Sequence, residues 1–397
     1  MPHPETVGVR AGIARTEFFE TSEALFLNSG YTYATAEDAE RAFNGDVERF
    51  VYSRYGNPTV AMLEDRLRAL QPGAAACTAT ASGMGAVYTA LRAVLRPGDH
   101  LVAARSLFGS CYVICEEILP AWGVEVTFVD GRDLDEWADA ITSRTRAVFF
   151  ETPSNPMQHL VDVGAVAALA HAVGAHVVVD HGFLPIGMQH CFDLGADIVV
   201  HSATKTADGQ GRVMGGAILT ATDALMVDTI QPLIKHTGPT LAPFNAWVIG
   251  KGLETLALRS RACAQSAHTI AATLRTHPQV SWVRYPHDPS HPQYDLAQRQ
   301  MTAGGTVITF ELASQTTEAK TAAFGFMNAL QLIDISNNFG DAKSLIAHPA
   351  TTTHRAIGAD GRAAIGLTDG VLRLSVGLEH THDLTDDLER ALANTTR

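Results

Sequence analysis

The chain has 397 residues, of which 46% are hydrophobic and 18% are charged. This length suggests two or three domains, and the composition is that of an ordinary globular protein with a large core. The formal net charge of −13, without any basic run, excludes nucleic acid and anionic membranes as expected partners. No apolar stretch approaches the ~18 to 20 residues that cross a bilayer. The N-terminal Met-Pro-His-Pro-Glu lacks the basic and apolar regions of a secretory signal.

The cysteines are irregularly spaced and include no Cys-x-x-Cys pair; they are Cys77, Cys111, Cys115, Cys191 and Cys263. We interpret them as reduced thiols of a cytoplasmic protein. Cys111 and Cys115 lie one turn apart on an expected helix, which is compatible with a pair of metal ligands. Because no second ligand pair follows, we interpret them as two core residues and predict no metal site.

Residues 1–60 carry few periodic segments and many small polar residues, which is typical of an arm or a lid. From about residue 61 onward, strands and helices alternate. Strands are expected at 74–80, 100–104, 124–129, 147–151, 177–180 and 198–201, and helices at 60–70, 83–95, 111–122, 134–142 and 162–173. Short strands that are apolar on both faces indicate a mostly parallel sheet covered by helices on both sides.

After about residue 243 the pattern changes to that of a smaller α+β domain. One long helical stretch is expected at 244–274, strands at 282–285, 306–312 and 372–376, and further helices near 316–330 and 383–393. We therefore divide the chain into an arm (1–60), an α/β domain that holds the candidate cofactor site (61–255) and a C-terminal α+β domain (256–397).

Lys205 follows a short apolar strand and two hydroxyl residues, Ser202 and Thr204. Asp180 ends an earlier apolar run, His176–Asp180. Neighbouring strands of an α/β sheet would place both at the same carboxyl edge, where cofactors bind in such sheets. Pyridoxal phosphate (PLP) requires this pair, because the lysine holds its aldehyde as a Schiff base and the acid keeps its ring nitrogen protonated. For this pair alone, a lysine that is merely solvated explains the pattern equally well.

The segment Thr80-Ala-Ser-Gly-Met-Gly85 lies between an expected strand and an expected helix. Such a turn presents free backbone N–H groups at the positive end of a helix, which suits a phosphate. Ser202 and Thr204 would add hydroxyl donors from the Lys205 strand. An ordinary tight turn at 80–85 and turn-forming hydroxyls at 202 and 204 remain alternatives.

Five ordered motifs resemble the Cys/Met-metabolism family of PLP enzymes: Tyr52-Ser-Arg-Tyr-Gly-Asn-Pro-Thr59, Ala81-Ser-Gly-Met84, Glu151-Thr-Pro-Ser-Asn-Pro156, Ser202-Ala-Thr-Lys205 and Leu372-Arg-Leu-Ser-Val-Gly-Leu-Glu379. The similarity runs from about residue 7 to the C-terminus. It implies a PLP-dependent, aspartate-aminotransferase-like (fold type I) large domain with a mostly parallel sheet, and a smaller α+β C-terminal domain.

The resemblance also implies residue roles. Lys205 would form the Schiff base and move protons, and Asp180 would pair with the ring nitrogen. The implied phosphate ligands are the backbone amides of Gly83 and Met84 and the hydroxyls of Ser202 and Thr204. Arg373 would grip the substrate α-carboxylate as a bidentate fork, assisted by Asn155 and the backbone at Asn338. Phe108 would stack on the ring where many relatives have a tyrosine.

Tyr52, which is expected to act in catalysis as well, and Arg54 would reach the phosphate of a neighbouring subunit. The resemblance therefore implies a homo-oligomer of at least a dimer, which we expect to be a tetramer.

Three further stretches resemble the O-succinylhomoserine sulfhydrylase subgroup: Asp208-Gly-Gln-Gly-Arg212, Pro243–Trp247 with Gly252–Thr255, and Asn338–Ser344 before His348–His354. The implied reaction is γ-substitution on an O-acyl-L-homoserine, with O-succinylhomoserine and sulfide as the preferred substrates and homocysteine as product. A divergent γ-synthase or γ-lyase, or a PLP-binding protein without turnover, are the alternatives. The complete set of Asp180, Lys205 and Arg373 argues against loss of turnover.

The segment Asp180-His-Gly-Phe-Leu-Pro-Ile186 departs from the family pattern Asp-Asn-x-Phe-Ala-Thr-Pro. Because proline restricts its own backbone and that of the preceding residue, we expect an altered loop beside the cofactor, shaped by Leu184, Pro185 and Ile186. His181 is either an acid/base group near neutral pH or a filler bonded to backbone, and the second interpretation is preferred.

Overall fold

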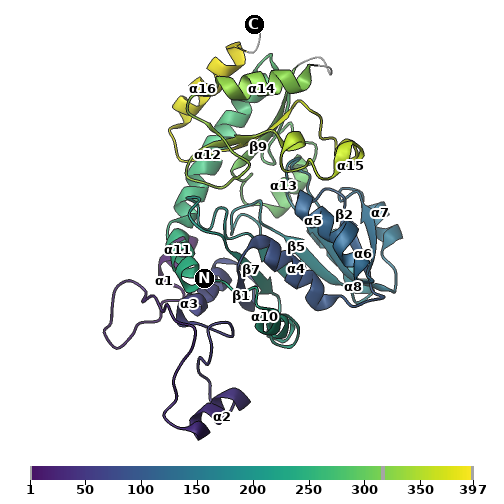
Figure 1. Ribbon diagram of the computed structural model, residues 1–397. Coiled ribbons are helices and arrows are strands. Elements are labelled where there is room, and N and C mark those ends of the chain that lie inside the picture. The colour runs from purple at the N-terminus through teal and green to yellow at the C-terminus, as the bar shows by residue number, and fades with distance from the viewer. Residues whose placement is uncertain (1, 314–317, 395–397) are drawn as a thin grey trace.

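The computed structural model describes residues 2–313 and 318–394, which form two sheets and their helices. The larger sheet has seven strands in the order β1-β7-β6-β5-β4-β2-β3, and the smaller has five in the order β10-β11-β12-β9-β8. Figure 1 shows helices on both sides of the larger sheet and the smaller sheet beside it. The predicted fold class is confirmed.

The strands of the larger sheet are β1 (Ala76–Thr80), β2 (His100–Ala104), β3 (Glu125–Val129), β4 (Thr145–Glu151), β5 (His176–Asp180), β6 (Ile198–His201) and β7 (Gly216–Thr220). Strands β3, β2, β4, β5 and β6 pair in parallel, while β7 is antiparallel to both β6 and β1. No strand was expected at β7, because it starts at Gly216, directly after Gly215, and paired glycines favour a turn. Here glycine is required by packing, since a Cβ at Gly216 would lie 2.3 Å from the Ser82 carbonyl oxygen.

Helices cover the two faces of this sheet through separate apolar clusters. One face carries α4 (Gly83–Val94), α5 (Gly109–Val113), α6 (Leu119–Ala121) and α10 (Gln231–Thr237). The other carries α3 (Pro58–Leu70), α7 (Leu134–Ala140), α8 (Val163–Ala172) and α11 (Pro243–Leu253). Cys111 and Cys115 are both buried in the first face, in agreement with their interpretation as core residues.

Two predicted helices have different internal structure. The helix expected at 111–122 runs through a π-helical turn, Ile114–Ile118, between α5 and α6. The single helix expected at 244–274 is wrong, because the chain forms α11 and then α12 (Leu256–Thr276). The guanidinium of Arg259 bonds the Gly252 carbonyl at 2.7 Å and the Thr206 carbonyl at 2.9 Å, and so occupies the acceptors near the break.

The smaller sheet consists of β8 (Val280–Arg284), β9 (Val307–Leu312), β10 (Asp334–Ile335), β11 (Leu345–Ala347) and β12 (Val371–Ser375). Its core packs against α12, α14 (Ala319–Ala329) and α16 (Thr381–Asn394). Residues 316 and 317 of the helix expected near 316–330 lie outside the described residues. The remaining elements are α9 (Asp223–Leu225), a π-helical turn (Met226–Ile230), α13 (Tyr294–Gln300), a 3-10 turn (Pro349–Thr351) and α15 (Gly358–Ala364).

The N-terminal segment begins on the body of the protein and then leaves it. Helix α1 (Pro4–Arg10) packs against α3 and α12. The purple segment that carries α2 (Ala36–Asn44) extends away from the rest of the chain (Figure 1). Phe18, Phe19 and Phe43 on this segment are 82%, 80% and 64% exposed, so it presents apolar surface in an isolated subunit.

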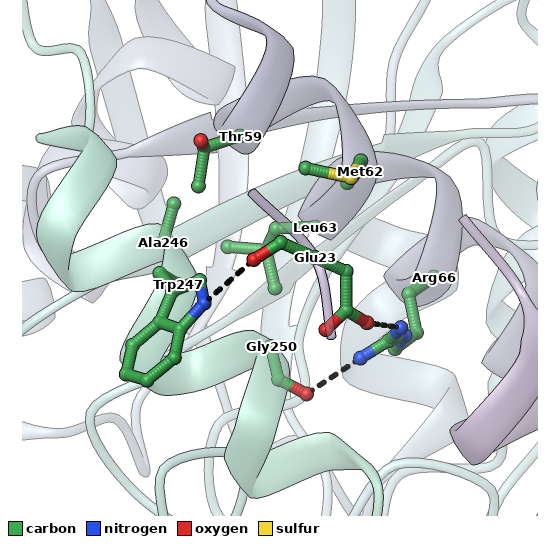
Figure 2. A pocket seen from close by; sticks show the side chains of 8 residues that line it. All are labelled: Glu23, Thr59, Met62, Leu63, Arg66, Ala246, Trp247 and Gly250. Carbon is green, nitrogen blue, oxygen red and sulfur yellow. Dashed lines mark hydrogen bonds and ion pairs between the residues drawn. The ribbon is translucent and has the colours of Figure 1, made fainter. Parts of the chain in front are cut away.

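An ion-pair cluster ties this segment to α3 and α11 (Figure 2). Arg66 is 2% exposed, ion-pairs with Glu23 and donates from Nη1 to the Gly250 carbonyl at 2.8 Å. Lys251 Nζ lies 2.5 Å from the other Glu23 oxygen, and Trp247 Nε1 donates to the Glu23 carbonyl at 3.2 Å. Burial raises the pKa of Glu23, but hydrogen bonds from Lys251 and Arg66 outweigh this effect and lower it to about 2.

Arg66→Ala should lower the free energy of unfolding by about 3 kcal/mol, because it removes one of the two cations that pair with the enclosed Glu23 carboxylate and the donor to the Gly250 carbonyl. Arg68→Ala is the matched control, since Arg68 is exposed and its ion pair with Asp65 should contribute below ~1 kcal/mol. Urea unfolding measures both.

The Glu23 carboxylate should contribute fully to the free energy of unfolding above its unfolded-state pKa, near 4.5. This contribution should be lost as pH falls toward its folded-state pKa of about 2. Equal effects of the two substitutions, or a pH-independent difference between wild type and Arg66→Ala over that range, would contradict this assignment.

Candidate functional site

Three neighbouring parallel strands bring chemistry-bearing side chains to one edge of the larger sheet. Asp180 is the last residue of β5, and Glu151, its partner in the ladder, is the last residue of β4. Lys205 follows the end of β6 in the adjoining turn. The structure therefore places Lys205 and Asp180 at the same edge, where the strand pattern put them.

Lys205 is largely shielded from water and makes one side-chain hydrogen bond of normal geometry, from Nζ to Asn338 Oδ1 at 2.6 Å. Its ammonium lies 4.6 Å from the centre of the Phe339 ring. Burial, and next the positive charge of Arg373, lower the pKa of Lys205 from 10.5 to about 8. An amine with this pKa can both hold and release a proton near neutral pH.

Arg373 on β12 is 1% exposed. Its hydrogen-bond acceptors among the described residues are all neutral oxygen atoms. Nη1 donates to Asn155 Oδ1 at 2.9 Å, and Nη2 donates to the carbonyls of Asn337 and Asn338 at 2.8 and 3.2 Å. Nε is buried without a partner among the described residues. Burial lowers the pKa of Arg373 to about 10, so the guanidinium is a charged group ready for an anion.

Asp180 is fixed by two donors. Its Oδ1 accepts the Gly182 N–H at 2.9 Å, and its Oδ2 lies 3.5 Å from the Cys111 thiol. Burial raises the pKa of Asp180, while both hydrogen bonds lower it. Cys111 was predicted to be a core residue, and the structure adds this contact with Asp180.

The turn before α4 provides an anion site. Ser82 caps the helix by accepting the Gly85 N–H at 3.0 Å, while the amides of Gly83 and Met84 in the first turn have no acceptor within the helix. A Cβ on Gly83 would lie 2.8 Å from Ser202 Cβ, so the two segments approach closely. The hydroxyl of Thr204 exchanges hydrogen bonds with Gly215 at 3.1 Å.

The loop after β4 joins the remaining site residues. Asn155 is 2% exposed and anchors Arg373. Phe108 is the N-cap residue that precedes α5, and its ring meets His354 edge-on at 6.4 Å. A cavity of about 750 Å³ opens beside this part of the site, and its lining includes Phe108 and Asn337.

Tyr52 and Arg54 are not brought into this cluster within one chain, as far as the described residues show. Arg54 donates to the Lys235 carbonyl on α10 and lies over the rings of Tyr52 and Tyr55 at 5.4 and 4.8 Å. Tyr52 is 42% exposed.

The loop after Asp180 packs against the site through Phe183, whereas Leu184, Pro185 and Ile186 were expected to shape it. Leu184 and Ile186 pack into two core clusters. Phe183 instead meets the Phe339 ring at 5.0 Å, and that ring lies beneath Lys205 and Arg373. The expectation that Leu184 and Ile186 shape the wall beside the cofactor does not match the packing, because Leu184 turns into the core and Ile186 lines a different cavity, of about 510 Å³.

His181 is fully buried against His201, with ring centres 5.2 Å apart. Burial and the His201 ring lower the pKa of His181 well below its ordinary value, so it is neutral. Neither ring nitrogen has a hydrogen-bond partner of normal geometry among the described residues, although the Gln189 side chain lies beside it. The expected bond to backbone is therefore not formed.

Sequence reasoning missed Glu151 and Phe339 as site residues. The signal for Glu151 was present, since it ends an apolar strand in the same way as Asp180. No comparable signal marked Phe339, whose position depends on contacts between the two sheets.

Within residues 2–313 and 318–394, no group of three or more His, Cys, Asp and Glu side chains is gathered to hold a metal ion. No helix in that part of the chain combines the length and apolar character needed to span a bilayer.

Comparison with known proteins places this site in a family. The family model described as "Cys/Met metabolism PLP-dependent enzyme" matches residues 5–393. The chain is 60% identical over 389 residues to O-succinylhomoserine sulfhydrylase of Mycobacterium tuberculosis, covering 98% of this chain and 95% of the relative. It is 42% identical over 389 residues to the enzyme of the same name from Pseudomonas aeruginosa, with the same coverage of 98% and 95%.

The fold agrees with these matches. The crystal structure of cystathionine γ-synthase from Xanthomonas oryzae pv. oryzae in complex with cystathionine superposes with a TM-score of 0.93 at 34% identity, covering 100% of this chain and 99% of that one. The chain belongs to the Cys/Met-metabolism family of PLP-dependent enzymes.

The residues present fit this cofactor. A desolvated amine, a buried carboxyl and a helix N-terminus with free amides lie along one sheet edge, which matches an aldehyde, a ring nitrogen and a phosphate respectively.

Arg373→Met should raise the pKa of Lys205 above about 8, because it removes the neighbouring positive charge. The value should stay below 10.5, because burial remains. Arg212→Met is the control, since Arg212 pairs with Asp208 at 2.9 Å and should leave Lys205 unchanged. The measurement is the pH dependence of Lys205 labelling by an amine reagent in cofactor-free protein. An unchanged Lys205 pKa in Arg373→Met would show that the charge of Arg373 does not lower it.

Proposed function

We propose that this enzyme catalyses γ-substitution on O-succinyl-L-homoserine, with sulfide as nucleophile, to give homocysteine and succinate. The observation that carries the proposal is the identity to two O-succinylhomoserine sulfhydrylases over nearly the whole chain. The same site residues suit other O-acyl homoserines, so the acyl group is the part of the proposal that rests most on those relatives.

At the cofactor end, Lys205 would hold the aldehyde carbon and Asp180 would pair with the ring nitrogen. Phe108 would stack on the ring. The amides of Gly83 and Met84, Ser202 and Thr204 would hold the phosphate. For Thr204 to donate to the phosphate, its hydroxyl must turn away from the Gly215 carbonyl that it now bonds.

At the substrate end, Arg373 binds the α-carboxylate, and Asn155 and the backbone of Asn338 fix the guanidinium. Because Arg373 is buried and its partners are neutral, an incoming carboxylate supplies the missing counter-charge. The 750 Å³ cavity beside Phe108 gives room for the acyl part of the ester.

When bound, PLP withdraws electrons from the substrate α-carbon and so makes its C–H and the neighbouring C–H acidic. Lys205 removes the α-proton and then mediates loss of a β-proton, which allows succinate to leave the γ-carbon. Sulfide adds at the γ-carbon, and Lys205 returns the protons. Its pKa of about 8 suits both directions of transfer.

Tyr52 and Arg54 act in the site of a neighbouring subunit, where Tyr52 assists catalysis and Arg54 contacts the phosphate. The extended, apolar N-terminal segment supports this proposal, because exposed aromatic side chains are a feature of subunit interfaces. We propose a dimer of site-sharing subunits that assembles into a tetramer. We also propose the division into an arm (1–60), a PLP-binding domain (61–255) and a C-terminal domain (256–397), and a cytoplasmic location in keeping with five free thiols.

The proposed reaction is tested by steady-state assays of purified enzyme with O-succinyl- and O-acetylhomoserine, with and without sulfide. We expect homocysteine from O-succinylhomoserine only when sulfide is present, and no turnover by Lys205→Ala.

Two results would change the assignment. Sulfide-independent release of an α-keto acid and ammonia would identify a γ-lyase. A higher kcat/KM with another thiol nucleophile would identify a γ-synthase.

Mixing Arg54→Ala and Lys205→Ala subunits should restore part of the activity that each variant lacks. In a mixed dimer, one site combines an intact Lys205 with an intact Arg54 from the other subunit. The measurement is activity after denaturing and refolding the two variants together, with mixed oligomers verified by differential tags. Inactive mixed oligomers would place Arg54 in the site of its own subunit.

A further inference from the structure

Glu151 is a buried carboxyl that the proposed reaction does not use. It is 4% exposed at the end of β4, directly beside Asp180 in the parallel ladder with β5. Two backbone N–H groups donate to it, from Phe108 at 3.1 Å and from Asn155 at 3.2 Å. Glu151 therefore connects the segment that contains Phe108 to the loop in which Asn155 anchors Arg373.

Both hydrogen bonds end on the same oxygen, Oε2. The other oxygen, Oε1, can therefore carry a proton without the loss of either bond. Glutamine can replace glutamate here with one oxygen accepting both donors, which makes Glu151→Gln a close mimic of the neutral acid.

Two carboxylates that are buried side by side do not both ionise readily. The ionised and titratable groups that act on Glu151 are Asp180 from β5, Arg373 from β12 and Cys111 from α5. Burial and the negative charge of Asp180 raise the pKa of Glu151 well above its ordinary value, and the hydrogen bonds and Arg373 offset this only in part. Asp180, with its own two donors, ionises first, so Glu151 retains the proton.

We propose that Glu151 is a positioning residue that is protonated in the cofactor-free enzyme and releases its proton when a protonated ring nitrogen pairs with Asp180. The cation neutralises the charge of Asp180, and this removes the repulsion that, after burial, raises the pKa of Glu151 most, while the two N–H donors and Arg373 continue to favour the carboxylate. The proton leaves Oε1 for solvent, and the resulting carboxylate accepts the Phe108 and Asn155 N–H groups more strongly. Cofactor binding thereby tightens both segments. This inference rests on the proposed pairing of Asp180 with the ring nitrogen.

By linkage, a ligand whose binding releases a proton binds more tightly as pH rises. The test uses Lys205→Ala protein stripped of PLP, so that no proton exchange arises from Lys205. Calorimetric titration with PLP in two buffers of different ionisation enthalpy counts the protons released, and the slope of log K against pH gives the same number. We expect Lys205→Ala to release roughly one proton more per subunit than Lys205→Ala/Glu151→Gln over part of the range between pH ~5 and 8.

An equal proton count in the two proteins overturns the inference. A PLP analogue with carbon in place of the ring nitrogen gives a second measurement on the Lys205→Ala protein alone, and it decides the question if the double variant does not fold. The analogue should release fewer protons than PLP, and equal release would also overturn the inference. Failure of PLP to bind at all would instead contradict the proposed cofactor site.

Discussion

The site depends on one buried cation that joins the two sheets. Arg373 extends from β12 of the smaller sheet to Asn155 in the loop after β4 of the larger sheet, and it also holds the carbonyls at 337 and 338. A buried ion normally requires a counter-ion. Because the hydrogen-bond acceptors of Arg373 among the described residues are neutral oxygens, its charge is oriented but not cancelled. The fold thus keeps a desolvated positive charge available for a carboxylate ligand.

The same charge acts on the catalytic amine. Arg373 and Lys205 lie over the Phe339 ring, with centroid distances of 5.1 and 4.6 Å, and the Lys205 ammonium bonds the Asn338 side chain. The guanidinium helps burial to lower the lysine pKa, while the aromatic face gives a weak attraction to both cations. Positive charge is therefore concentrated at the substrate end of the site, and the two carboxyls, Glu151 and Asp180, lie at the end proposed for the ring nitrogen.

Much of this arrangement could be predicted from the sequence, because it follows from strand ends. The strands at 100–104 and 198–201 and the edge shared by Asp180 and Lys205 are consequences of local apolar runs and parallel pairing. What could not be predicted depends on contacts between distant segments. Strand β7 begins at Gly216, directly after Gly215, and paired glycines favour a turn in a local pattern. The need for glycine at 216 is visible only in its contact with Ser82.

The position of Phe339 likewise results from packing against Phe183 and Val307 of β9, and the inward direction of Leu184 from packing against α12 and α13. Either an inward or an outward side chain at residue 184 is compatible with the local sequence.

The unusual loop after Asp180 is tolerated because the acid is held by backbone groups. The Gly182 N–H bonds the carboxylate, and the His181 N–H bonds the Val200 carbonyl at 2.8 Å, so β5 and β6 stay joined beyond the end of the strand. The loop therefore does not need the family's usual asparagine at 181 to position Asp180. A side chain at 182 would fit tightly, since a Cβ there would lie 3.1 Å from Asp180 Oδ1 and 3.4 Å from the Ser202 backbone nitrogen. The departure thus preserves a backbone donor to the acid, and the loop also meets the reacting groups through Phe183, whose ring packs against Phe339.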